Sequence, residues 1–406
     1  MESASAYAAV EPNLRLIPLH QALTRSLVWL PIFVLFTRAR FDLDGALVLA
    51  SLYYLFVVVL EVPSGWMSDR LGRTITLRIA AASWVGAHLS FLIGDDRFWA
   101  IMLGQFLLAG GFASLSGTDV TFHFDTLESL GLEREFARRE ARVASIGFAA
   151  AAMSGVAGGV LGLVDLRLAF LASLALAVAQ LVVAMRLVEP PTGRHADPFV
   201  RQLRTCAGYL RDRWIGWIFF YGVVLVTLEH VAFTVAQPWI TEVLDRPADD
   251  LGVTPLLTGT TFAVVAIVGS VAARSSARLG ERFGVAPTLI GFGALSAAVV
   301  TGMALWVHAA MLVLLAFRSA QGAAAPVLIS AAVAPVTAPG HRATLLSINS
   351  LAGRLSYGVF LLVVTTDAED DVVGVLTTFS IVSWSLVAVL IVTAWWATRG
   401  RAAATT

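Results

Sequence analysis

Twelve long apolar segments constrain the fold of this chain more than any other feature of its sequence. Each is about 20 residues long, the length that a helix needs to cross the hydrocarbon core of a bilayer. Hydrophobic residues make up 58% of the 406 positions and charged residues only 14%, against roughly a quarter in a soluble domain. We therefore predict an all-α polytopic membrane protein. The predicted spans are 14–37, 45–66, 74–93, 98–122, 142–163, 167–187, 214–240, 253–273, 285–306, 309–332, 344–366 and 372–396.

The arginines are distributed unevenly among the loops that join these spans. If the N-terminus is cytoplasmic, arginines gather in inner loops at 70–78, 134–142 and 186–213, whereas outer loops carry acidic pairs such as Asp95-Asp96. Basic residues are retained on the cytoplasmic side during insertion, so we predict both termini in the cytoplasm. All 28 basic residues are Arg and none is Lys. This bias is typical of a GC-rich bacterial gene, and the predicted location is the bacterial plasma membrane.

The longest interval between spans, 188–213, divides the chain into two sets of six spans of nearly equal length. Asp-Arg-Leu-Gly at 69–72 is followed in the second half by Glu-Arg-Phe-Gly at 281–284, which favours an internal duplication. The predicted organisation is two six-helix bundles, 1–190 and 213–406, joined by a cytoplasmic linker, 191–212.

Two residue types give weaker indications. The one cysteine, Cys206, has no partner for an internal disulfide; we interpret it as a filler residue in the linker that a thiol reagent reaches from the cytoplasm. Tryptophans near span ends are interpreted as an interfacial belt: Trp214, Trp217, Trp239, Trp384, Trp395 and Trp396.

A short loop between the second and third spans carries the most specific motif. Residues 65–73 are Gly-Trp-Met-Ser-Asp-Arg-Leu-Gly-Arg. Gly65 would let a helix end approach a neighbour closely, and Gly72 permits a tight turn. Asp69 can accept hydrogen bonds from the positive end of another helix and from Arg73, which closes a charge-assisted latch.

This spacing resembles the signature of the major facilitator superfamily, a Gly followed by Asp-Arg and Gly-Arg in a cytoplasmic loop. The match extends to Glu-Val-Pro-Ser at 61–64, Asp-Thr-Leu at 125–127 and Arg-Ala-Thr at 342–344, which are similar to one bacterial branch of drug and metabolite exporters. The resemblance implies two pseudo-symmetric bundles that work by alternating access. Together with position in the spans, it assigns gating roles to Glu61, Gly65, Asp69, Arg70, Gly72, Arg73, Asp119, Asp125 and Arg342.

Ionisable residues inside spans are costly, and each is by default a functional hypothesis. In the fold of the superfamily the first, fourth, seventh and tenth spans line the central cavity, so Arg25, Glu229 and Arg318 are predicted to line it. Arg354 and His230 join this set as candidates for substrate binding or proton coupling, although a lone membrane His is more often a packing residue. Six ionisable residues within spans stand out: Arg25, Glu61, Asp119, Glu229, Arg318 and Arg354.

Two motifs of the superfamily are altered. The Arg-x-x-Gln-Gly pattern usual in the fourth span stands in the tenth, at 318–322. The fifth span is rich in glycine, as in the antiporter motif, but lacks its proline. Its glycines fit either that motif or ordinary packing of small residues: Gly147, Gly155, Gly158, Gly159 and Gly162.

These features predict a secondary active transporter that is no enzyme and uses no cofactor or metal. Its expected partners are a small-molecule substrate, protons and the lipid bilayer, without nucleic acid, and it is expected to work as a monomer. The first hypothesis is proton-coupled efflux, by antiport, of small amphipathic compounds such as drugs or natural products. A proton-coupled importer of a small nutrient is the alternative within transport. A polytopic membrane enzyme is disfavoured, because the sequence holds no clustered His, Asp or Glu at metal-ligand spacing. Transport driven by ATP is also disfavoured, because the sequence holds no nucleotide loop.

Overall fold

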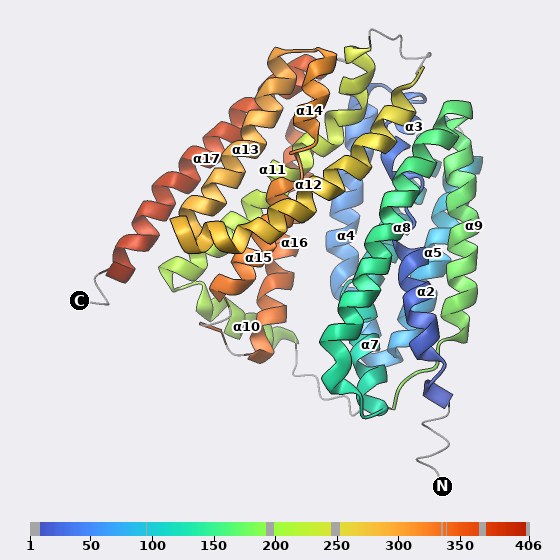
Figure 1. Ribbon diagram of the computed structural model, residues 1–406. Coiled ribbons are helices and arrows are strands. Elements are labelled where there is room, and N and C mark those ends of the chain that lie inside the picture. The colour runs from blue at the N-terminus through green and yellow to red at the C-terminus, as the bar shows by residue number, and fades with distance from the viewer. Residues whose placement is uncertain are drawn as a thin grey trace. The chain divides into compact units, whose positions relative to one another are not determined.

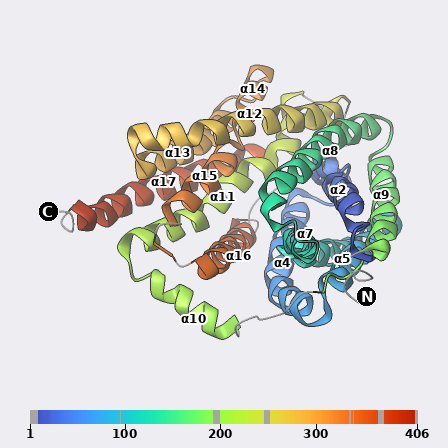
Figure 2. The ribbon, with the colours of Figure 1, turned by 60° about the horizontal axis from the view of Figure 1, so that its bottom comes forward.

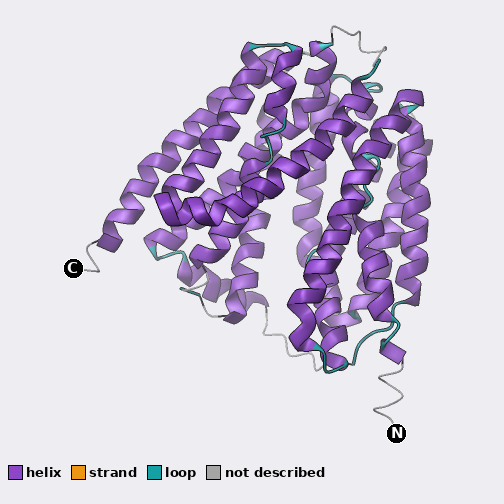
Figure 3. Cartoon of the chain, viewed as in Figure 1, coloured by secondary structure: helices purple, strands orange, loops and turns teal. Residues whose placement is uncertain are grey.

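The computed structural model of this chain consists of helices joined by short loops (Figure 3). It describes residues 9–94, 96–191, 199–244, 252–333, 336–337, 339–364 and 371–402, and no strand occurs in these ranges. Twelve spans in the described ranges are long and apolar enough to cross a membrane. The predicted all-α polytopic fold and its number of spans are confirmed.

The chain divides into two compact units by its internal contacts. The first comprises Met1–Arg40 and Leu52–Ala196, and the second Phe41–Ser51 and Asp197–Thr406. This division differs from the predicted bundles in placing 41–51 with the second unit. There the Ser51 hydroxyl donates a hydrogen bond to the carbonyl of Gly358 at 2.6 Å.

In the first unit α5 packs against both α6 and α9, and α2 packs against α8. Figure 1 shows α5 beside α9 and α2 beside α8. Its helices, with α4 beginning in the second unit, are α2 (Asn13–Arg25), η1 (Leu30–Ile32), α3 (Phe33–Arg38), α4 (Leu43–Leu71), α5 (Arg73–Ile93), α6 (Phe98–Leu115), α7 (Thr118–Ser129), η2 (Glu133–Glu135), α8 (Phe136–Val164) and α9 (Leu166–Arg186).

Two spans of the first unit are interrupted, and each break has a local cause. The first span breaks after Arg25, and Pro31, which has no backbone N–H, stands at the start of η1. The freed backbone N–H of Trp29 donates to the hydroxyl of Ser173 on α9 at 3.2 Å. The fourth span breaks at Gly117, whose φ of 74° is left-handed and favours glycine.

In the second unit α11 contacts α13, α15, α16 and α17, and it runs between α15 and α16 in Figure 2. The helices are α10 (Phe199–Tyr209), α11 (Arg213–Val243), α12 (Thr254–Phe283), α13 (Val285–Leu305), η3 (Ala309–Met311), α14 (Leu312–Leu315), α15 (Ala320–Val333), α16 (Pro339–Val364) and α17 (Val372–Ala402). The tenth span is interrupted between α14 and α15.

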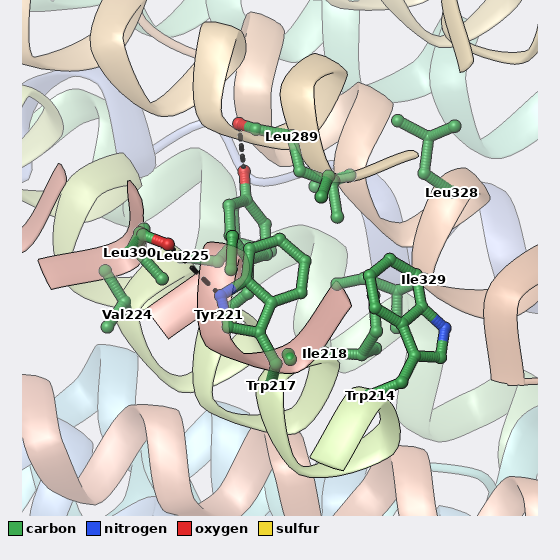
Figure 4. Packing of buried hydrophobic residues seen from close by; sticks show 14 of the residues in the cluster. Trp214, Trp217, Ile218, Tyr221, Val224, Leu225, Leu289, Leu328, Ile329 and Leu390 are labelled. Atoms are coloured by element: carbon green, nitrogen blue, oxygen red, sulfur yellow. Dashed lines mark hydrogen bonds between the residues drawn. The ribbon is translucent and has the colours of Figure 1, made fainter. Parts of the chain in front are cut away.

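Aromatic side chains of α11 form the core of the second unit (Figure 4). The indole of Trp217 donates to the carbonyl of Leu390 on α17 at 3.2 Å, and the Tyr221 hydroxyl donates to that of Leu289 on α13 at 2.9 Å. Lipid tails are as apolar as these side chains, so close packing and buried hydrogen bonds stabilise the unit more than removal from water does.

The interpretation of the tryptophans as an interfacial belt is wrong for half of them. Trp214, Trp217 and Trp239 are buried, with 7%, 3% and 0% of their surface exposed. All three belong to α11, which neighbours cover on several sides, so even its ends are enclosed. Trp384, Trp395 and Trp396, on α17, are exposed, as a belt requires.

Cys206 is also placed differently from the prediction. It lies on α10, a short amphipathic helix, and only 1% of its surface is exposed. The side chain belongs to the hydrophobic cluster of Trp214 and Trp217. Cys206 is therefore a core residue of the second unit and not an accessible filler in a loop.

Candidate functional site

The loop between α4 and α5 contains the two glycines of the predicted gate. Gly72 has a φ of 116°, so the turn requires a residue without a Cβ. Gly65 is exposed, and a Cβ added there would meet nothing within 4 Å among the described residues. The close helix approach expected at Gly65 is therefore absent from the part of the chain that the structure describes.

Glu189, which follows α9, caps the first turn of α5. One carboxylate oxygen accepts from the backbone N–H of Arg73 at 2.9 Å. The other accepts from the N–H and the hydroxyl of Thr74, both at 2.7 Å. A carboxylate at this end satisfies unpaired donors and lies favourably in the helix dipole. In return Arg78 of α5 donates to the α9 carbonyls of Ala184 and Met185.

Sequence reasoning missed Glu189. The only signal available was an acidic residue in an interval rich in Arg, directly before Pro190. Nothing in the sequence indicates that this residue folds back on the turn at Gly72. An added Cβ at Gly72 would lie 3.0 Å from the Glu189 carboxylate, so the glycine also makes room for the cap.

The Arg73 side chain joins α4, α5 and α7. It donates to the hydroxyl of Ser68 at 2.9 Å, and its Nε lies 3.6 Å from a carboxylate oxygen of Asp125. The Ser68 hydroxyl also accepts from the hydroxyl of Thr118 at 3.1 Å. The structure therefore brings together Arg73 and Asp125, two of the predicted gate residues.

The other members of the predicted gate differ in their exposure and in what their side chains contact. Glu61 lies on α4 and accepts a hydrogen bond from the hydroxyl of Ser116 at 3.0 Å, at the break between α6 and α7. Arg70 is exposed, with its guanidinium 5.7 Å from the centre of the Trp66 ring. The side chains of Asp69 and Arg342 lie outside the described parts of the chain, so their roles stay predictions.

Arg25 and Asp119 lie near each other within the first unit. Asp119, at the start of α7, accepts the backbone N–H of Val120 at 2.8 Å and is within electrostatic reach of Arg25. Arg25 is exposed at the end of α2, and the stem of its side chain lies against Gly147 of α8.

Two glycines of the fifth span have packing roles. A Cβ on Gly147 would lie 3.0 Å from the Arg25 stem, and a Cβ on Gly158 would overlap the carbonyl of Val28. These glycines let α8 approach the first span closely. The packing interpretation accounts for both without an antiporter motif.

In the second unit the altered Arg-x-x-Gln-Gly motif faces α11. The carboxylate of Glu229 lies directly against Gly322, where an added Cβ would overlap it. Gln321 donates from its side-chain amide to the hydroxyl of Tyr221 at 2.9 Å. Only a glycine at 322 leaves room for the Glu229 carboxylate.

Arg318, the first residue of that motif, is buried, with 6% of its surface exposed. Its guanidinium lies 5.0 Å from the centre of the Phe233 ring, and Glu229 is within electrostatic reach. Its Nε has no hydrogen-bond partner among the described residues. A buried cation with an unused donor beside a half-buried carboxylate can bind an anionic or polar group, or compensate the carboxylate when it ionises.

His230 lies beside α16, and Arg354 belongs to that helix. The Nδ1 of His230 is 2.8 Å from the carbonyl of Val226, one turn earlier, and its ring centre is 5.4 Å from that of Tyr357. Neighbouring residues on a helix point about 100° apart, so His230 does not share the position of Glu229 against α15. Arg354 is half-buried on α16, one turn before Tyr357.

Comparison with known proteins agrees with this architecture. The family model described as Major Facilitator Superfamily matches residues 21–361. No curated protein sequence matches the chain.

Similar solved structures include the nucleoside transporter NupG, at 13% identity and a TM-score of 0.73, covering 96% of this chain and 98% of that one. A peptide transporter POT in complex with sulfate has 14% identity and a TM-score of 0.73, covering 95% of each chain. A bacterial homolog of the human lysosomal transporter Spinster, inward-facing and unoccupied, has 13% identity and a TM-score of 0.68, covering 98% of this chain and 97% of that one. At these identities the likeness shows the fold alone.

Proposed function

The chain belongs to the Major Facilitator Superfamily and is a multi-pass membrane transporter, and we propose that it exports small amphipathic organic compounds in exchange for protons. The sequence holds no nucleotide-binding loop, so the proposed driving force is an ion gradient. The proposed location is a bacterial plasma membrane with both termini in the cytoplasm, as the arginine asymmetry favours. We propose that one copy of the chain suffices for transport.

One observation carries the proposal of proton coupling: Glu229 lies half-buried against Gly322, within electrostatic reach of the buried Arg318. An ionised carboxylate inside a membrane span is costly unless a cation compensates it, and protonation removes the charge. A change in the separation of Glu229 and Arg318 would therefore decide whether the carboxylate keeps a proton. An antiporter needs such an alternation, with substrate and proton bound in turn.

Arg73, Asp125 and Glu61 are proposed as gate residues, together with Asp69 and Arg342. The support is that Arg73 contacts both the end of α4 and α7, so a movement of either helix changes its contacts. The exposed Arg25 is proposed to act with Asp119. His230 and Arg354 stay weaker proposals, because neither is seen against Glu229.

Import of a small nutrient is the second candidate. Two of the similar structures are named as a nucleoside transporter and a peptide transporter, and both substrates are polar metabolites. The unused donor of Arg318 would suit a polar or anionic substrate equally well.

Expression of the chain in a host that lacks its own exporters separates the two candidates. Export predicts higher tolerance to a panel of amphipathic toxic compounds and lower accumulation of a fluorescent one. Import predicts growth on a nucleoside or peptide that the host cannot otherwise take up. Growth without any gain in tolerance would overturn the export proposal.

A further inference from the structure

A small cavity lies within the first unit, and ionisable side chains from three helices line it. His20 comes from α2, Asp119 and His123 from α7, and Glu140 from α8. The cavity volume is about 20 Å³, enough for one water molecule, which needs roughly 10–15 Å³. The candidate transport residue Glu229 belongs to the other unit.

His20 brings to this cavity a buried ring nitrogen that makes no hydrogen bond to the described residues. Its side chain is buried, with 4% exposed, and its Nε2 has no hydrogen-bond partner among the described residues. A buried polar atom without a hydrogen-bond partner destabilises the folded protein. A water molecule in the cavity would supply that partner.

His123 and Glu140 are hydrogen-bonded to each other. The Nδ1 of His123 lies 2.6 Å from a carboxylate oxygen of Glu140, and only 4% of the histidine is exposed. A hydrogen bond this short is charge-assisted. Whichever atom carries the proton, the second carboxylate oxygen of Glu140 is left as an acceptor.

The charged groups around the cavity are more negative than positive when both histidines are neutral. Asp119 and Glu140 act on each other electrostatically, and Arg25 acts on Asp119. With both histidines neutral, two carboxylates face one guanidinium. α5 adds only Leu77 to the lining, and the residue lining it after α9 is Leu187.

The charged groups nearest to the cavity on α5 are engaged elsewhere. Arg73 contacts Asp125, and Arg78 donates to carbonyls of α9. A net negative charge in a partly buried site favours the uptake of a cation. The cavity can hold one water molecule, and histidine nitrogens that can accept a proton line it. Both features suit the binding of a proton.

We propose that this cavity binds one proton, held by a water molecule between His20 Nε2 and the carboxylates of Asp119 and Glu140. The bound proton is accepted by His20 or by one of these carboxylates, and no other bond changes. The site adds a second proton-binding position to the proposed transport function, but it depends on neither the substrate nor Glu229.

Nuclear magnetic resonance of the full chain in lipid nanodiscs tests the proposal, with the seven histidines labelled by ¹⁵N in the ring. Spectra are recorded without substrate from about pH 3 to about pH 9, a range extended to low pH because His20 and His123 are buried. His20→Asn and His123→Asn assign the two signals. We expect the signals of His20 and His123 to change together, and Asp119→Asn to displace both changes.

Glu128→Gln is the matched control, because Glu128 is an exposed carboxylate on the same helix that does not line the cavity. It should leave both midpoints in place. His88 is an internal control, buried among the rings of Trp29, Phe91 and Phe170. Its signal should not change.

Two results would overturn the proposal. In the unmodified protein, His20 and His123 that keep one protonation state throughout, or that titrate independently, exclude a shared proton. Midpoints that move when sodium replaces choline at constant ionic strength would assign the cavity to an alkali cation. Since substrate is absent, the outcome is independent of any failure of the export proposal.

Discussion

Glu189 Oε2 accepts hydrogen bonds from both the backbone N–H and the hydroxyl of Thr74, at 2.7 Å each, although the two residues are 115 positions apart. This contact ties the end of the sixth span to the start of the third. It also holds the turn at Gly72, one residue before the family motif ends at Arg73.

Removal of this cap should destabilise the protein. Replacing a capping carboxylate by alanine costs about 0.5–2 kcal/mol, so we expect Glu189→Ala to lower the melting temperature, and Glu189→Gln, which keeps one acceptor oxygen, to lower it less. Thermal unfolding in detergent measures both. Glu128→Gln, at an exposed carboxylate, is the control; equal melting temperatures for all three variants would contradict the capping role.

The pair of Arg73 and Asp125 should act as a unit in transport. Arg73→Gln and Asp125→Asn are each expected to slow turnover with little change in substrate affinity. The double variant should be no slower than the worse single one, because contacting residues are coupled by about 0.5–3 kcal/mol. Transport rates and binding at equal expression complete this double-mutant cycle. Strictly additive losses would show that the two side chains act separately.

Glu229→Gln should abolish proton-driven transport while keeping substrate binding and exchange. The amide keeps the shape of the side chain but carries no titratable proton. Reconstituted vesicles with an imposed pH gradient measure the first property, and counterflow measures the second. Glu242→Gln, an exposed carboxylate on the same helix, should transport normally. Accumulation that still follows the pH gradient in Glu229→Gln would place coupling elsewhere.

Gly322→Ala should impair transport through the position of Glu229. The added Cβ would overlap the Glu229 carboxylate, and a displacement of about 1 Å at a functional group can reduce a rate by about 100-fold. Gly291→Ala is the matched control, because its added Cβ meets nothing within 4 Å. Similar rates in the two variants would disprove the close contact.

Cys206 should react slowly with thiol reagents, whichever side of the membrane they are added to. The side chain is buried, and burial raises the pKa of its thiol, so the reactive thiolate is scarcer near neutral pH and increases as pH rises. Maleimide labelling should therefore be slow in folded protein, rise with pH and become fast on unfolding. Rapid labelling of folded protein at neutral pH would contradict the burial.

Topology needs a different reporter. Gly208 is exposed on the same helix, and an added Cβ there meets nothing, so Gly208→Cys in a Cys206→Ser background provides an accessible thiol. We expect an impermeant maleimide to label it in inside-out vesicles and not in intact cells. The opposite pattern would invert the proposed orientation.

Hydropathy predicted the fold because lipid imposes one rule on every span, about 20 apolar residues in a helix. The same rule does not predict which helix is enclosed by its neighbours. Trp217 and Trp239 therefore looked like belt residues from their positions, although α11 is covered on several sides. The turn at Gly72 was predictable, since it depends on one residue and its φ.

Contacts between distant segments were beyond the sequence. Glu229 and Gly322 were each noticed, as an intramembrane carboxylate and as part of a motif, but their contact depends on the packing of α11 against α15. The cavity of His20, Asp119, His123 and Glu140 likewise needs three helices to meet. His20, His123 and Glu140 stand alone in the sequence, with nothing to set them apart from packing or surface residues.

The first unit should bend mainly at the few residues that interrupt its first and fourth spans. A continuous helix bends only as a whole rod, whereas two shorter rods joined by an unwound residue turn against each other by changing a few dihedral angles. In the first span that joint is the segment before Trp29, whose amide is bonded to Ser173 rather than to its own helix. In the fourth it is Gly117. Any bending that moves α2 or α7 as rigid rods would thus be absorbed at these joints, and their amides should exchange hydrogen faster than those of the rods on either side.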